Sequence, residues 1–62
     1  MPRVIVEWLE GRTKETRDAL AKKITEDVVT IVPNTRPESV TVVFKENQLD
    51  KWYKAGIPGT EK

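Results

Sequence analysis

The sequence lacks the two residue types that most often stabilise a very short chain or carry its chemistry. It has neither cysteine nor histidine among its 62 residues, which excludes disulfides, thiolate metal sites and the commonest acid–base side chain. No clustered aspartate spacing suits a site for Mg²⁺ or Ca²⁺, so we expect no metal and no cofactor. A chain of about 60 residues is only marginally stable alone, and association with other copies is the remaining means of stabilising it.

Long runs of charged or apolar residues are also missing. The 11 Lys and Arg residues and the 10 Asp and Glu residues are interleaved along the chain, so no basic stripe predicts a nucleic-acid partner. No apolar stretch approaches a membrane span, and no signal-peptide pattern opens the chain. We therefore expect a soluble, cytoplasmic homo-oligomer that binds neither nucleic acid nor a membrane.

The first half of the chain predicts a strand followed by a helix. Residues 3–9 (RVIVEWL) are β-branched and aromatic, with apolar side chains on both faces, and Gly11 is the natural turn residue after them. Thr13 suits the N-cap of a helix that runs from residue 14 to about residue 31. Charged residues such as Arg17 are mostly left for solvent. The apolar stripe of this helix consists of Leu20, Ile24, Val28 and Ile31.

The second half predicts another strand and a short tail. Residues 39–45 (SVTVVFK) suit a strand, and the tail from residue 46 predicts a loop with a short helical turn and a hairpin-like end. Strand, helix and strand in this order indicate two parallel strands joined by a right-handed crossover. We therefore expect an α/β (α+β) fold with residues 1–62 as a single domain. This β-α-β unit leaves one sheet face and both strand edges open, so oligomerisation would complete it.

Two residues of chemical interest flank the first strand. Removal of Met1 would give Pro2 a free secondary amine, and apolar surroundings with a nearby cation would lower its pKa toward neutrality, as a general base requires. Arg12, at the Gly11 turn, is suited to gripping a carboxylate through two N–H groups. Each also has a more ordinary interpretation, because proline after methionine is common and a loop arginine is usually a solvated cation.

The spacing of Pro2 and Arg12 predicts a site shared between subunits. At about 3.3 Å per extended residue, the two lie roughly 30 Å apart, which no small substrate bridges. A site that uses both must therefore take them from different copies. An antiparallel pairing of first strands across a two-fold axis would bring the start of one strand beside the end of the other.

Several short motifs stand beside the apolar first strand and the amphipathic helix: Met1-Pro2, Leu9-Glu10-Gly11-Arg12-Thr13, Pro37-Glu38-Ser39-Val40, Glu46 and the aromatic Trp52. With these features the sequence resembles the 4-oxalocrotonate tautomerase family over nearly its whole length. The resemblance implies a tautomerase-like domain over residues 1–62, assembled as a hexamer that is a trimer of dimers. It also implies an isomerase that catalyses cofactor-independent keto–enol tautomerisation of a 2-hydroxydienoate, enol or 2-oxo acid.

Functional roles carry over to this chain position by position. The resemblance implies that Pro2 is the general base and acid, that Arg12 holds a substrate carboxylate and that Trp52 forms an apolar pocket wall. It also places Leu9 and Ser39 in the lining of the site. Core packing for Leu9 and a turn cap for Ser39 are the more ordinary interpretations, and interface packing explains Trp52 equally well.

A departure from the family pattern leaves alternatives open. Thr41 stands where well-studied members carry a second arginine that binds substrate and stabilises the developing enolate. The chain is therefore a tautomerase, a decarboxylase or hydratase on the same scaffold, or a non-catalytic oligomeric scaffold or binding module.

Overall fold

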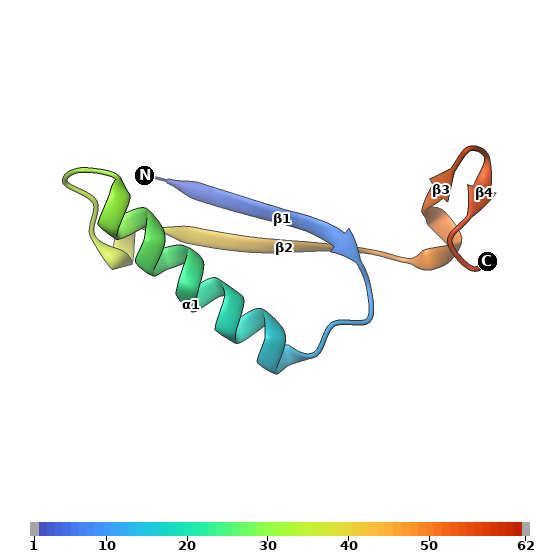
Figure 1. Ribbon diagram of the computed structural model, residues 1–62, viewed down its shortest axis with the longest axis horizontal. Helices are drawn as coiled ribbons and strands as arrows, with labels where there is room; N and C mark the ends of the chain where they lie inside the picture. Colours follow the sequence, from blue (N-terminus) through green and yellow to red (C-terminus); the bar gives the residue numbers. More distant parts are fainter. Residues whose placement is uncertain (1, 62) are drawn as a thin grey trace.

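Strand, helix and strand follow one another as the sequence predicts. In this computed structural model, which describes residues 2–61, β1 (Arg3–Leu9), α1 (Lys14–Ile31) and β2 (Thr41–Asn47) form one β-α-β unit. The two strands pair in parallel along their full lengths. Figure 1 shows α1 lying on one side of this two-stranded sheet. The predicted fold class is therefore confirmed.

The ends of α1 show where its apolar stripe meets the sheet and where it does not. Thr13 caps the helix, its side-chain oxygen accepting a hydrogen bond from the Thr16 amide at 3.2 Å. Leu20, the first residue of the stripe, is half-buried. Ile31, the last residue of the stripe, was predicted to be covered as well. This prediction is wrong, since Ile31 is 76% exposed. From first to last residue, the helix is about 26 Å long and the strands only about 20 Å, so the last turn overhangs the sheet.

The second strand begins two residues later than predicted. Pro37–Ser39 form the short 3-10 helix η1, in which Pro37 fixes the first turn and the Ser39 hydroxyl donates to the Arg36 carbonyl at 2.8 Å. β2 then starts at Thr41, whose amide donates to the Pro2 carbonyl at 3.0 Å. Ser39 therefore lies in a turn beside the start of β1.

The tail forms short elements beyond the far end of the sheet. η2 (Leu49–Lys51) leads into a hairpin of β3 (Tyr53–Lys54) and β4 (Ile57–Pro58), which pair antiparallel. Figure 1 places this hairpin past the ends of β1 and β2, away from α1. Tyr53 and Ile57 are 62% and 53% exposed, so the hairpin has apolar surface that its own chain does not cover.

A single chain is too open to be a finished domain. Its radius of gyration is 14.9 Å, against about 10.6 Å for a compact domain of this length. Its accessible surface is 5142 Å², against about 4,100 Å² for a compact protein of this mass. Residues 2–61 include no fully buried side chain, and Ile5 and Val43 stay 52% and 40% exposed on the sheet face away from α1. Such a surface is typical of a subunit that other copies complete.

Candidate active site

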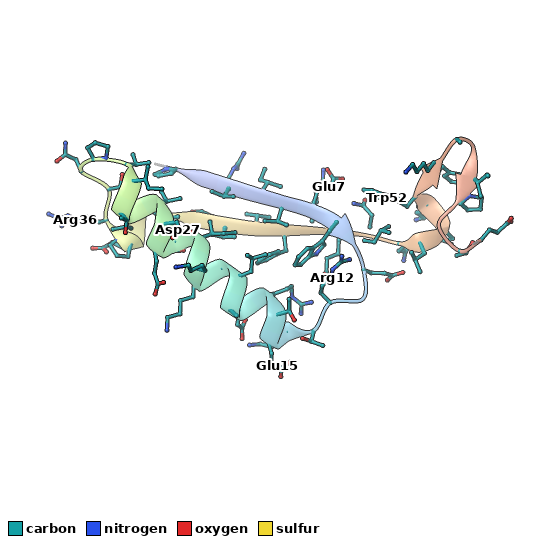
Figure 2. The ribbon with its side chains drawn as sticks, viewed as in Figure 1. Glu7, Arg12, Glu15, Asp27, Arg36 and Trp52 are labelled. Atoms are coloured by element: carbon teal, nitrogen blue, oxygen red, sulfur yellow. The ribbon has the colours of Figure 1, made fainter. Side chains whose placement is uncertain are left out.

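The predicted site residues form two groups at opposite ends of the sheet. Pro2 and Ser39 lie where the two strands begin, and Leu9 is the last residue of β1. Figure 2 shows Arg12 and Trp52 at or beyond the end where the strands finish. β1 advances about 20 Å from its first to its last residue. One chain therefore does not bring the five residues together.

The first group is built on the pairing of Pro2 with β2. Pro2 is half-buried, and its carbonyl oxygen accepts the Thr41 amide at 3.0 Å, which ties it to the first residue of β2. The hydroxyl of the neighbouring Ser39 donates a hydrogen bond to the Arg36 carbonyl in the η1 turn. Met1, whose removal would free the Pro2 amine, lies outside the described residues.

In the second group, a turn positions Arg12. Gly11 has φ +121°, which strains any residue with a side chain, and this conformation folds the chain back after β1. Arg12 Nη1 then donates to the Leu9 carbonyl at 2.9 Å, and its Cζ lies 4.8 Å from the centroid of the Trp8 ring. The turn returns Arg12 to the level of Trp8. Its separation from Pro2 is therefore closer to the length of β1, about 20 Å, than to the roughly 30 Å expected of an extended chain.

Trp8 belongs to a network of contacts that the sequence analysis missed. Its ring stacks on Phe44 with centroids 5.2 Å apart and planes at 22°, and its Nε1–H donates to Glu46 Oε2 at 3.2 Å. Arg17 Nη1 donates to the same carboxylate oxygen at 3.2 Å and to the Arg12 carbonyl at 3.0 Å. The network joins the ends of β1 and β2 to the loop between β1 and α1 and to the first turn of α1.

Arg17 and Arg12 differ in what they bind. The prediction that Arg17 faces solvent is wrong, because its side chain is only 31% exposed and pairs with Glu46. Its position three residues before Leu20, on the same helix face, was the available signal. Among residues 2–61, no carboxylate lies within ion-pair distance of Arg12. Most N–H groups of Arg12 are therefore left for a ligand.

Trp52 lies between the sheet and the hairpin (Figure 2). It follows η2, with its amide donating to the Leu49 carbonyl at 3.3 Å and its carbonyl accepting the Gly59 amide at 2.7 Å. Its side chain is 37% exposed and lines a hollow of about 490 Å³ together with Ile57 and Pro58 of β4. This apolar surface is open to a ligand or to another subunit.

A further hollow lies along α1, away from these residues. It measures about 540 Å³ and is lined by residues including Ala21, Thr25, Val29 and Pro37, none of them a predicted site residue.

Within residues 2–61, no group of three or more acidic side chains could hold a metal ion. In the same part of the chain, no helix combines the length and apolarity needed to cross a bilayer.

Structural relatives share the β-α-β fold. The crystal structure of a 4-oxalocrotonate tautomerase homologue matches with a TM-score of 0.92 at 29% identity, covering 100% of this chain and 97% of that one. A heterohexamer 4-oxalocrotonate tautomerase from Chloroflexus aurantiacus matches with a TM-score of 0.85, covering 98% of this chain and 97% of that one. At 23% identity, this second likeness shows the fold alone.

Sequence comparisons identify the family. The family model described as "Tautomerase enzyme" matches residues 2–60. A probable tautomerase of Bacillus cereus is 43% identical over 56 residues, which cover 90% of this chain and 88% of that protein. A probable tautomerase of Halalkalibacterium halodurans is 39% identical over 56 residues, which cover 90% of each chain. The resemblance seen in the sequence is thereby confirmed: this chain belongs to the tautomerase family.

Proposed function

We propose that the protein is an isomerase that interconverts the enol and keto forms of a 2-hydroxydienoate, another enol or a 2-oxo acid without a cofactor. The observation that carries the proposal is the state of Arg12. Its guanidinium is held by the Trp8 ring and the Leu9 carbonyl, and no carboxylate among residues 2–61 pairs with it. Such a group is suited to bind a carboxylate of the substrate. Membership of the tautomerase family supports the same reaction class.

In this proposal Pro2 transfers the proton. After Met1 is removed, the secondary amine of Pro2 accepts the proton of the enol hydroxyl while the carbonyl forms, and the prolinium returns a proton to carbon. The enol O–H bond breaks and a C–H bond forms, while the C=C double bond of the enol is exchanged for the C=O double bond of the ketone, so no other reactant is needed. Arg12 neutralises a carboxylate remote from the enol, and Trp52 supplies an apolar wall that favours the neutral amine.

We place the site between two subunits that pair through β1. A two-fold axis at Ile5 would set Arg3 of one strand opposite Glu7 of the second copy, and the symmetry repeats this pair of opposite charges. Both side chains are exposed, and along the alternating strand they share a face with Ile5. A similar pairing of β2 about Val43 would set Thr41 opposite Lys45, which is not a pair of opposite charges. The charge pattern therefore favours β1.

The same register would complete the chemistry. With Ile5 on the axis, Pro2 falls opposite Trp8 of the second copy, at a backbone separation of about 5 Å. Arg12 of that copy lies over its own Trp8 ring, as it does in the chain described here. Pro2 and Trp8 are both at even positions of the alternating strand, so both are on the α1 side of the sheet. Each dimer would then hold two sites, each with the base of one chain and the arginine of the other.

Further copies would cover the surface that this dimer leaves open. Pairing through β1 covers one strand edge but leaves the apolar side chains of Ile5, Val43, Tyr53 and Ile57 exposed. We propose a homo-hexamer built as a trimer of dimers. The similarly folded protein from Chloroflexus aurantiacus is a heterohexamer, which supports an assembly of this size.

The test compares protein that retains Met1 with protein from which Met1 has been removed, each verified by intact-mass spectrometry. With Met1 attached, the Pro2 nitrogen is an amide without a basic lone pair. Ketonisation of phenylenolpyruvate should therefore fall by at least about 100-fold, the usual contribution of a general base. Equal rates for the two forms would rule out Pro2 as the base and leave a non-catalytic oligomeric scaffold as the better interpretation.

The pH profile of the Met1-free protein gives a second readout. Apolar surroundings and the neighbouring Arg12 both disfavour the charged amine, so we expect the pKa of Pro2 below the ordinary α-amino range of about 7.7–8.0. The base acts when neutral, which means that kcat/KM rises with pH through this pKa. Arg12→Ala removes the repulsion between like charges and should move the rising limb to higher pH.

A further inference from the structure

We propose that Trp8 is the positioning residue for Arg12: its ring holds the guanidinium in place before a substrate carboxylate arrives. The inference rests on the proposed function of Arg12 as the carboxylate anchor. Arg12 Cζ lies 4.8 Å from the centroid of the Trp8 ring, within the range of a cation–π contact. The ring face therefore acts on the cation directly.

The Trp8 ring is itself fixed from two directions. It stacks on Phe44 of β2 with centroids 5.2 Å apart, and its Nε1–H donates to Glu46 Oε2 at 3.2 Å. Glu46 is the residue opposite Trp8 in the strand register and is anchored in turn by Arg17 at 3.2 Å. These contacts leave the ring little freedom to rotate, so the guanidinium above it has one defined surface.

Arg12 is confined on its other sides as well. Its Nη1 donates to the Leu9 carbonyl at 2.9 Å, and its own carbonyl accepts Arg17 Nη1 at 3.0 Å. A long side chain that is ordered in advance loses less conformational entropy when it binds a ligand. Trp8 is thus expected to lower the concentration of dicarboxylate needed for binding.

A purely structural role for Trp8 makes a different prediction. Trp8 is half-buried and packs on Phe44, so an aliphatic residue of similar size would fill most of the same space. If packing were its whole role, substitution would weaken the binding of every ligand and would do so whether or not Arg12 is present. Coupling between Trp8 and Arg12 therefore separates the two roles.

The experiment is a double-mutant cycle on the binding of adipate, a saturated dicarboxylate that cannot react. Calorimetry would compare the wild type, Trp8→Leu, Arg12→Ala and the double variant, all as the assembled, Met1-free protein. We expect Trp8→Leu to weaken adipate binding by about fivefold, the size of a cation–π contact, and to have no further effect once Arg12 is alanine. An unchanged affinity in Trp8→Leu, or the same loss in both backgrounds, overturns the proposal.

Kinetics separate this inference from the proposed reaction. Trp8→Leu should raise KM several-fold more for a dicarboxylate dienol than for the monoacid phenylenolpyruvate, which has no second carboxylate for Arg12 to hold. An equal rise in KM for both substrates overturns the positioning role. If the wild type has no tautomerase activity but adipate shows the coupling, the proposed reaction fails and the role of Trp8 stands. If the wild type is active but adipate shows no coupling, the proposed reaction stands and the positioning role of Trp8 fails.

Two further measurements cover the case in which Trp8→Leu does not fold. Trp8→Phe keeps an aromatic face while losing the Nε1–H donor and the smaller of the two indole rings, so its affinity for adipate should stay within about twofold of the wild type. A loss as large as that of Arg12→Ala overturns the proposal. In the folded wild type, the ring current of Trp8 should shift the Arg12 side-chain proton resonances upfield. The shift should persist in Trp52→Phe, which removes the other tryptophan, and unshifted resonances in the wild type contradict the contact.

Discussion

The two ends of β1 are built in different ways. At the amino end, Pro2 is attached to β2 by one backbone hydrogen bond, from the Thr41 amide. At the carboxyl end, four side chains each make at least two contacts within one network: Trp8, Arg12, Arg17 and Glu46. The amino end presents a backbone nitrogen, whereas the carboxyl end presents an oriented cation.

This difference explains why the chain is incomplete alone. Burial alone lowers the pKa of an amine such as that of Pro2, and neighbouring subunits can supply that burial. A flexible arginine needs local contacts to be ordered, and those contacts must come from its own chain. In the proposed mechanism, β1 acts as a spacer of about 20 Å that keeps the base and the carboxylate anchor apart within one copy and allows them to meet between copies.

The largest expected effect after blocking Pro2 comes from the carboxyl end. Arg12→Ala should raise KM for a dicarboxylate dienol by about 10- to 100-fold, because a charge-assisted hydrogen-bonded pair is lost. Activity on phenylenolpyruvate should change much less, since that substrate has no second carboxylate for Arg12 to hold. Steady-state kinetics on both substrates check this, and equal losses on both would show that Arg12 is structural or acts on the transition state generally.

A charge swap tests the pairing that would bring the two ends together. Arg3→Glu places like charges opposite each other twice per dimer and should raise the dissociation constant of the assembly about tenfold. Adding Glu7→Arg restores opposite charges and should restore the assembly. Sedimentation over a dilution series measures both. A double variant no better than the single one would contradict the register, and a compact, folded single chain of the wild type at micromolar concentration would contradict the need for assembly.

The smallest expected effect is at Thr41, beside Pro2. Thr41→Arg would place a cation next to the proposed base, where it could stabilise the negative charge that develops on the enolate oxygen. We expect turnover of dicarboxylate dienols to rise by several-fold, with less change for phenylenolpyruvate. A folded Thr41→Arg variant with unchanged kcat on both substrates would show that the missing arginine does not limit the reaction.

Local signals in the sequence were sufficient for most of the fold. Thr13 and the apolar spacing of α1 predicted its bounds, and two β-branched segments predicted the parallel strands. The start of β2 was misplaced because strand propensity extends into Ser39, whereas Pro37 and the Ser39 hydroxyl favour a tight turn there. Ile31 was misplaced because periodicity does not reveal that the helix is longer than the sheet.

The site was harder to predict because its contacts cross elements. The Gly11 turn was expected, but its fold-back, which returns Arg12 to Trp8, depends on a backbone angle that a sequence does not specify. The pairing of Arg17 with Glu46 joins residues 29 positions apart, and a charged residue on a helix is usually exposed. The separation of Pro2 and Arg12 within one chain could be anticipated, because the predicted strand over residues 3–9 holds its two ends about 20 Å apart.

Subunit mixing tests the central claim, that each site takes Pro2 from one copy and Arg12 from another. One parent would retain Met1 and keep Arg12; the other would lack Met1 and carry Arg12→Ala. The two are unfolded together and refolded, and kcat/KM is measured on a dicarboxylate dienol at low substrate concentration. Random assembly should give roughly a quarter of the sites both functional groups, and hence about a quarter of wild-type activity. Activity no higher than the mean of the separately refolded parents would contradict a site shared between subunits.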